Sequence, residues 1–209
     1  MPYEPDAPLA EQIRASVASS LAHFTFDGDE PPYLDALVLH SPLPTAAETR
    51  AAWALLSAYV PRQIRHLGIS NAPLPAVRAL CEPPDGAVPL SAVQNRFIPQ
   101  TRFEAPLRAL LRRNGAAFQS FWTLTGNPAL LASAPVGAVA DGAGVSREVA
   151  LYALVLGLEN TVVLDGTKSH MREDLEGVQR AGLWAEGEGR AVWDEALVKF
   201  KEEIGEEGQ

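Results

Sequence analysis

Short apolar segments alternate with helical segments along most of this 209-residue chain. The apolar segments have the length of buried strands and lie at residues 36–40, 64–71, 91–97, 117–124 and 160–166. Helical periodicity or helix-start signals lie between them, such as the capping box of Thr45 and Glu48. Parallel neighbouring strands need a crossover connection, which a helix supplies. The sequence therefore predicts an α/β fold with about five parallel strands and surrounding helices.

The composition restricts the environment and the partners of the chain. A formal net charge of −9 argues against binding to nucleic acid or to an anionic membrane surface. Cys81 is the only cysteine, which excludes an intramolecular disulfide and a thiolate metal cage. We find no metal-ligand motif, no signal peptide and no apolar run of membrane-spanning length. These features predict a cytoplasmic protein.

Polar residues follow the predicted strands at the points where the strands end. They are His40, Ser70, Asn71, Gln94, Asn95, Trp122, Thr123 and residues 165–168. In an α/β barrel, the carboxyl ends of the strands form the rim where the chemistry takes place, whereas the opposite end serves stability. We therefore expect a functional site at this rim.

The motifs at these strand ends resemble those of the aldo-keto reductases, in the same order and spacing. The stretches that carry the resemblance are LVLHSP, IRHLGISN, VQNRF, SFWTLTGNP and VVLDGT followed by HMREDL, within residues 9–178. The resemblance implies an NADP-dependent oxidoreductase that reduces aldehyde or ketone carbonyls on a (β/α)8 TIM barrel. Because a full barrel has eight strands, we expect an N-terminally truncated, partial barrel with the first three βα units missing. We expect one domain over residues 1–209, with a lead-in at 1–8, the barrel part at 9–178 and a tail helix within 179–209.

The resemblance also implies roles for individual residues. His40 matches the histidine that polarises the substrate carbonyl. Ser70, Asn71 and Gln94 match the group that holds the nicotinamide carboxamide, and their side chains offer both donors and acceptors. Trp122 matches the aromatic residue that stacks on the nicotinamide ring.

The remaining expected contacts concern the rest of the cofactor. Thr123, Leu124 and Gly126 match positions beside the pyrophosphate, and Gly166, Thr167 and Lys168 match the grip on the adenosine phosphate. Glu173 and Asp174 match an acid-plus-amide pair near the adenine. The usual phosphate-binding arginine falls on His170, and Arg172 lies two residues further on. NADP(H) is the expected cofactor, and NAD(H) stays open as the alternative.

The chain departs from the family pattern at the catalytic centre. The family's catalytic aspartate, tyrosine and lysine come from strands that precede residue 34, and they have no counterpart here. Tyr3 lies in a proline-rich lead-in and does not match the catalytic tyrosine. With His40 alone, we expect the activation barrier of hydride transfer to be higher by several kcal/mol. This corresponds to a reaction slower by on the order of a thousandfold.

Three interpretations follow from this departure. The chain is a reductase whose gene model lacks its first exon, a catalytically inactive remnant that still binds the cofactor, or an interaction subunit. A small-molecule carbonyl compound is the expected substrate. The open edges of a five-stranded partial barrel also favour a homodimer formed through those edges.

Overall fold

The computed structural model describes residues 2–24, 31–83, 86–166 and 169–206. The chain divides into two compact units, Met1–Gln94 and Asn95–Gln209. We describe each unit by itself, and the single domain over residues 1–209 stays a prediction.

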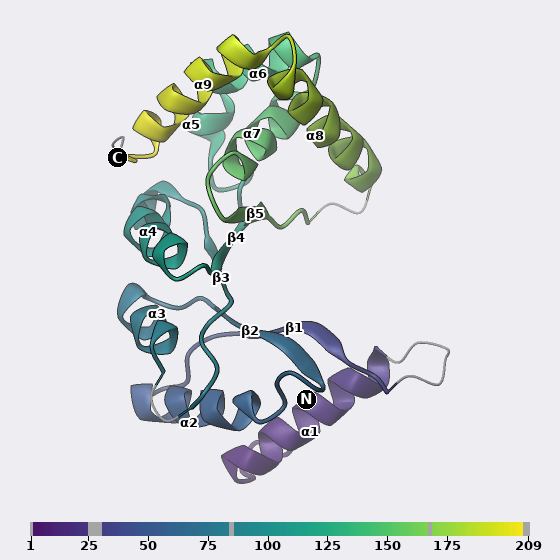
Figure 1. The fold of residues 1–209 in the computed structure, drawn as a ribbon, viewed down its shortest axis with the longest axis vertical. Helices are drawn as coiled ribbons and strands as arrows, with labels where there is room; N and C mark the ends of the chain where they lie inside the picture. Colours follow the sequence, from purple (N-terminus) through teal and green to yellow (C-terminus); the bar gives the residue numbers. More distant parts are fainter. Residues whose placement is uncertain (1, 25–30, 84–85, 167–168, 207–209) are drawn as a thin grey trace. The chain divides into compact units, whose positions relative to one another are not determined.

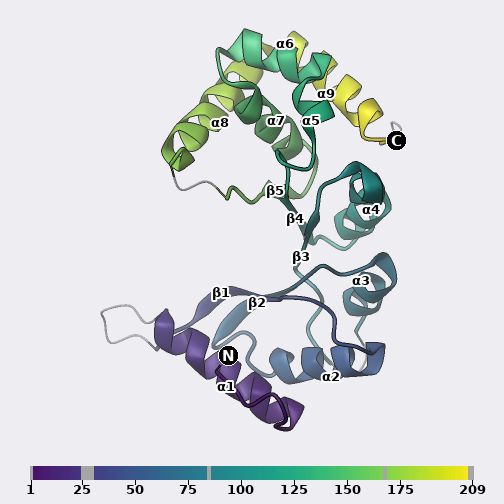
Figure 2. The same ribbon diagram turned by 180° about the vertical axis from the view of Figure 1, so that it is seen from behind.

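The first unit is a parallel sheet covered by helices. Strand β1 (Leu34–Leu39) pairs with β2 (Ile64–Ser70), and β2 pairs with β3 (Ala92–Arg96), which crosses the boundary between the units. Helices α1 (Leu9–His23) and α2 (Ala46–Ser57) lie along one face of the β1–β2 pair (Figures 1 and 2). Helix α3 (Leu74–Cys81) connects β2 to β3. The buried core of this unit includes Val17, Trp53, Ile64, Leu67, Ile69, Val77 and Leu80.

Helix α2 begins as the sequence predicts. The Glu48 amide donates to Thr45 Oγ1 at 3.1 Å, and the Thr45 amide donates to Glu48 Oε2 at 2.9 Å. The capping box is therefore confirmed, since both bonds are present. Trp53 on the same helix is buried, and its indole N–H donates to the Val88 carbonyl at 2.8 Å.

The second unit contains a parallel strand pair and a group of packed helices. After a 3₁₀ segment (Pro99–Glu104) come α4 (Ala105–Arg113), β4 (Ala117–Phe121), α5 (Pro128–Leu131), α6 (Ala134–Ala143), α7 (Arg147–Leu156), β5 (Thr161–Val163), α8 (Met171–Glu186) and α9 (Arg190–Glu203). Strand β4 pairs with β5, and the Phe97 amide beyond β3 donates to the Phe121 carbonyl at 3.0 Å. Helix α6 contacts α7 and α9, and α7 contacts α8.

The predicted fold class is confirmed. The described strands follow the chain order β1-β2-β3-β4-β5, and helices alternate with them. Strands β2 to β5 are shorter than expected, and β4 and β5 differ most. Strand β4 ends at Phe121 because Trp122 has a left-handed backbone with φ of 58°, and β5 covers three residues. Within the described ranges, no helix has the length and hydropathy needed to cross a bilayer.

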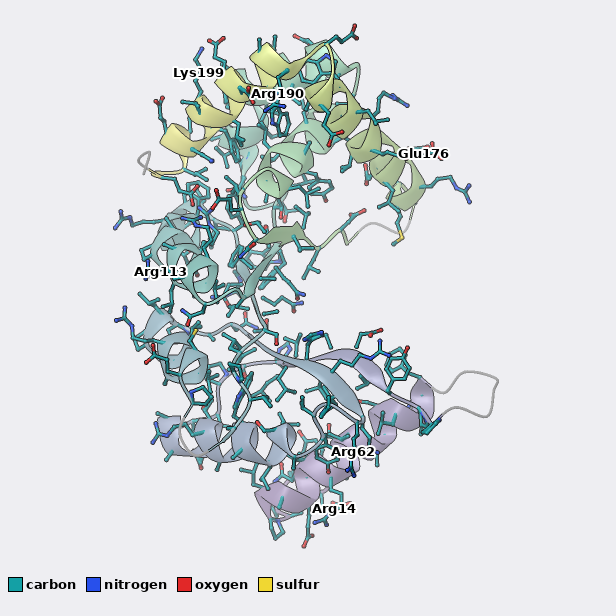
Figure 3. All side chains as sticks on the ribbon, viewed as in Figure 1. Arg14, Arg62, Arg113, Glu176, Arg190 and Lys199 are labelled. Atoms are coloured by element: carbon teal, nitrogen blue, oxygen red, sulfur yellow. The ribbon has the colours of Figure 1, made fainter. Side chains whose placement is uncertain are left out.

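The tail helix differs from its predicted pattern. The sequence places Val192, Ala196, Lys199 and Phe200 near one face, but only Ala196 and Phe200 are buried. Val192 is exposed, and Lys199 points outward to an ion pair with Glu195 (Figure 3). The buried face continues instead to Ile204, which keeps the spacing of four residues.

Candidate functional site

A hydrogen-bonded polar cluster lies at the carboxyl ends of β2 and β3 in the first unit. Ser70 Oγ donates to the Gln94 carbonyl at 2.7 Å, and the Asn71 amide donates to the same carbonyl at 3.1 Å. Asn71 Nδ2 donates to Ser70 Oγ at 3.1 Å and to the His40 carbonyl at 2.9 Å. Asn71 adopts φ of 52°, which asparagine tolerates better than most residues. The structure therefore brings Ser70, Asn71 and Gln94 together beside the end of β1.

His40 follows β1 and is exposed. Its contact with the cluster is made by its backbone carbonyl, which accepts from Asn71. Within the described part of the chain, no tyrosine or lysine donates a hydrogen bond to its ring. The imidazole is thus accessible, but its catalytic role stays a prediction.

Trp122 lies directly after β4 in the second unit and is 53% exposed. The guanidinium carbon of Arg96 lies 4.6 Å from the centroid of the indole ring, a cation–π distance. Phe121 contacts the same indole edge-on, with centroids 6.2 Å apart. Arg96 thus covers part of the ring that the sequence assigns to nicotinamide stacking.

The residues predicted to lie beside the pyrophosphate differ in their accessibility to a ligand. The Thr123 side chain is buried, and its Oγ1 lies 2.6 Å from Ser120 Oγ, so its hydroxyl is engaged inside the unit. A Cβ at Gly126 would approach Ile98 Cγ2 to 2.6 Å and the Trp122 carbonyl oxygen to 2.8 Å. Glycine at this position is therefore required for packing. Leu124, by contrast, lines a cavity.

This cavity of about 640 Å³ lies in the second unit between α7, α8 and the segment after β5. Its lining residues are Leu124, Gly144, Val145, Ser146, Glu148, Val149, Tyr152, Asp165, His170, Glu173, Asp174, Glu176, Gly177 and Arg180. Three predicted site residues from α8 and its start therefore meet Leu124 around one hollow. The described residues contain no group of three His, Cys, Asp or Glu side chains placed to hold a metal ion.

Two carboxylates of the cavity lining lie close to the buried Tyr152. Tyr152 is buried and donates its hydroxyl to Asp165 Oδ1 at 3.4 Å. Burial, followed by the charges of Asp165 and Asp174, raises the pKa of Tyr152 to about 12. Burial and the neighbouring Asp165 raise the pKa of Asp174 as well. At the rim, the contact of His170 with Glu173 Oε2 at 3.1 Å raises the pKa of the imidazole.

The stability of the protein is expected to fall more steeply above pH 10 than that of Tyr152→Phe. Because the folded-state pKa of Tyr152 lies near 12, above the unfolded value of 10, the unfolded chain loses this proton first. The contribution is therefore present below pH 10 and is lost as the pH rises toward 12. Urea unfolding at several alkaline pH values measures it, and parallel curves for both proteins would contradict it.

Sequence reasoning missed several residues of this region. Tyr152 lies within an apolar helical run, and no local signal distinguishes it from a core residue. Arg96 could have been found, since it lies two positions after Gln94 on the same strand and so projects from the same face. Gly166 ends the described range 86–166 and is exposed. Thr167 and Lys168 lie outside the described residues, so their predicted contacts stay predictions.

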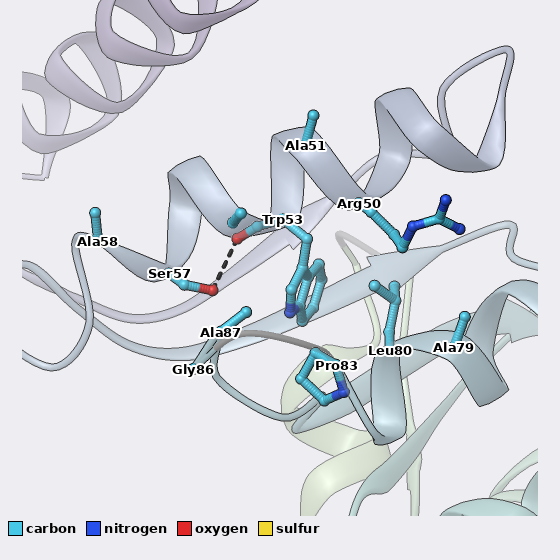
Figure 4. A pocket seen from close by; sticks show the side chains of 11 residues that line it. Arg50, Ala51, Trp53, Ser57, Ala58, Ala79, Leu80, Pro83, Gly86 and Ala87 are labelled. Carbon is cyan, nitrogen blue, oxygen red and sulfur yellow. Dashed lines mark hydrogen bonds between the residues drawn. The ribbon is translucent and has the colours of Figure 1, made fainter.

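A second cavity, of about 470 Å³, lies in the first unit between α2 and α3 (Figure 4). Small side chains and Trp53 form most of its described wall, and Arg50 is the charged residue among the described lining residues. Ser57 donates to the Trp53 carbonyl at 2.8 Å and is thereby engaged within α2. None of the predicted site residues lines this cavity.

Comparison with known proteins finds similarity in structure and not in sequence. No protein-family model and no curated protein matches the chain. The aldo/keto reductase from Brucella melitensis is similar with a TM-score of 0.65 and 17% identity, covering 91% of this chain and 68% of that one. The aldo/keto reductase from Klebsiella pneumoniae in complex with NADP and acetate has a TM-score of 0.65 and 21% identity, covering 90% of this chain and 65% of that one. MGS-M4, an aldo-keto reductase from a Medee basin deep-sea metagenome library, has a TM-score of 0.64 at 14% identity.

Proposed function

Because the chain has the aldo-keto reductase fold over 91% of its length, we propose that it binds a nicotinamide dinucleotide, NADP(H) or NAD(H). The observation that carries this proposal is the cavity that joins Leu124 to His170, Glu173 and Asp174. A similar solved structure from Klebsiella pneumoniae is a complex with NADPH. The adenosine end of the cofactor is assigned to this cavity.

The residues around the cavity suit an adenosine group. Leu124 and Val149 offer apolar contact to a base, and the carboxylates of Asp165 and Asp174 are acceptors for ribose hydroxyls. The roles expected for Asn71 and Gln94 at the carboxamide, and for Trp122 at the nicotinamide ring, stay predictions, because these residues belong to different units. The cofactor supplies a hydride when it is bound.

Addition of NADPH or NADH is expected to quench the tryptophan fluorescence of the full chain. Trp122 is half exposed, so a bound nicotinamide stacked on its ring would accept its excitation energy. In Trp122→Phe, most of the quenching is expected to disappear. Trp193→Phe is the matched control, because Trp193 packs against Ala143, Ala153 and Ala181, away from the proposed contacts.

The quenching experiment also decides the proposal as a whole. A fluorescence that stays constant for the wild type at saturating concentrations of both cofactors would remove it. Equal loss of quenching in both tryptophan variants would assign the signal to another site.

The proposed reaction is reduction of a small-molecule aldehyde or ketone, with His40 as the residue that polarises the carbonyl. The chain covers 68% of the Brucella melitensis structure and 65% of the Klebsiella pneumoniae structure, so this activity of the whole proteins is proposed here and not transferred. The proposed setting is cytoplasmic. A homodimer through the outer edges of β1 and β5 is the proposed assembly, since these strands end the described sheet.

Cofactor binding without turnover is the second candidate function. It is favoured by the surroundings of His40, where no described tyrosine or lysine reaches the ring. Cofactor oxidation with a panel of aldehydes distinguishes the two functions, because binding alone gives quenching without oxidation.

A further inference from the structure

We propose that the cavity beside α8 selects NAD(H) over NADP(H), with Asp165 and Asp174 as the specificity-determining residues. This inference rests on the proposed function, because it assigns the adenosine end of the cofactor to that cavity. It goes beyond the proposal by naming which of the two cofactors the chain prefers.

The charged side chains that line the cavity are mainly acidic. The carboxyl side chains around the cavity are those of Glu148, Asp165, Glu173, Asp174 and Glu176. Glu176 projects from the side of α8, as Figure 3 shows. The basic lining residues are Arg180 and His170. Acidic groups therefore outnumber basic groups in the described lining.

Each of the two basic residues makes a contact within the unit, although the carbonyl contact leaves the charge of Arg180 in place. Arg180 Nη1 donates to the Gly144 carbonyl at 3.3 Å, at the edge of the cavity. His170 Nδ1 lies 3.1 Å from Glu173 Oε2, so the charge of a protonated imidazole is balanced by an adjacent carboxylate. Neither arrangement resembles the bidentate arginine fork that holds a phosphate group well.

The two cofactors differ in the group at the 2′ position of the adenosine ribose. NAD(H) presents a 2′-hydroxyl, which can donate a hydrogen bond to a carboxylate, whereas NADP(H) presents a 2′-phosphate with a charge near −2. Acidic side chains at such a position favour the hydroxyl, and a nearby arginine favours the phosphate. Repulsion of the phosphate grows with burial of the carboxylates, because the effective dielectric constant falls.

Asp165 and Asp174 are the acids for which this argument is strongest. Both are partly buried, whereas Glu148, Glu173 and Glu176 are exposed. After burial, the charges of Asp165 and Asp174 raise the pKa of Tyr152, and the charge of Asp165 raises the pKa of Asp174. The contribution of the carboxylates to these shifts, and their place in the lining, are what would disfavour a phosphate dianion.

Isothermal titration calorimetry of the full chain with NADH and with NADPH tests the inference. We expect NADH to bind about tenfold more tightly, which corresponds to about 1.4 kcal/mol. The fragments 5′-AMP and 2′,5′-ADP isolate the adenosine end and are expected to show the same order. Tighter or equal binding of NADPH overturns the selectivity alone, whereas binding of neither dinucleotide overturns the proposed function as well.

Conservative variants assign the selectivity to residues. In Asp165→Asn and Asp174→Asn, we expect the preference for NADH to narrow by about threefold or more, which is about 0.6 kcal/mol. Asp141→Asn is the matched control, because Asp141 is exposed on α6 and lies outside the cavity. An unchanged ratio in both cavity variants, with thermal melts that show folded protein, overturns the assignment. Lys168→Ala tests the contribution of a basic residue to NADPH binding. If the wild type binds NADPH tightly and this variant loses much of that affinity, the proposed preference for NADH is overturned.

Discussion

Replacement of Glu206 by glutamine is expected to lower the free energy of unfolding by about 3 kcal/mol. Glu206 Oε1 lies 2.7 Å from Arg108 Nη1 and 3.0 Å from Arg112 Nη1. The side chain of Arg108 is only 1% exposed, so the variant leaves a buried guanidinium without its counter-ion. Removal of one partner from a buried ion pair costs more than the pair itself contributes, because the remaining charge stays desolvated.

The surroundings of Arg108 explain why it cannot escape to water. Its Nε donates to the Phe103 carbonyl at 2.9 Å, and its guanidinium lies 5.6 Å from the centroid of the Phe97 ring. Burial lowers the pKa of Arg108, and the neighbouring Glu206 opposes this shift by raising it. The ion pair therefore compensates for a desolvation that the α4 packing imposes.

Urea unfolding followed by far-ultraviolet circular dichroism measures the effect. Glu203→Gln is the matched control, since Glu203 is exposed near the end of α9 and the same charge is removed. We expect a change within about 0.5 kcal/mol for this control. The double variant Arg108→Met with Glu206→Leu should recover much of the loss, because an apolar replacement of both partners removes the buried charge. Equal effects of the two glutamine variants would show that solvent already screens Arg108.

Local signals in the sequence were sufficient to predict most of the elements. The Thr45 and Glu48 capping box, the start of α7 at Ser146 and the periodicity of α1 each depend on residues within one or two helical turns. The strand alternation also determined the parallel pairing, because a crossover helix leaves few other topologies. These features needed no knowledge of distant contacts.

The strand ends and irregular turns could not be predicted in the same way. Trp122, Arg102, Phe103 and Glu104 all have positive φ, which side chains of these types rarely adopt. Such conformations are held by surrounding packing, as with Phe103, which is buried and lies 5.1 Å from the Phe97 ring centroid. The sequence shows no local signal for them.

In the candidate site too, some residues follow from the local sequence pattern, whereas others depend on contacts between distant segments. Residues at strand ends, such as Asn71 and Gln94, were found because their place in the chain follows from the strand pattern. Tyr152 contributes to the cavity from the middle of α7, and its contact with Asp165 joins two segments that periodicity treats separately. The sequence also gave no indication that the Thr123 hydroxyl is engaged with Ser120. Side-chain contacts between elements therefore had to come from the structure.

Replacement of Gly142 by alanine is expected to destabilise the protein by about 1–2 kcal/mol, although alanine is the better helix former. Gly142 lies on α6, where a Cβ would overlap the ring of Trp184 from α8. The ring cannot easily move aside, because a Cβ at Gly189 would overlap it as well. Both glycines thus lie directly against the indole.

Gly182→Ala is the matched control, and it is expected to act in the opposite direction. Gly182 lies on α8 two residues before Trp184, and a Cβ there would have no atom within 4 Å. With no steric cost, the gain in helix propensity should stabilise the protein by about 0.5–1 kcal/mol. Thermal and urea unfolding of both variants measure the change in the free energy of unfolding. Changes of opposite sign cannot come from a general effect of replacing glycine by alanine. Trp184→Phe in the Gly142→Ala background should recover part of the loss, since the smaller ring leaves room for the methyl group. Stabilisation by both alanine variants would mean that α6 and α8 do not hold Trp184 as closely as described.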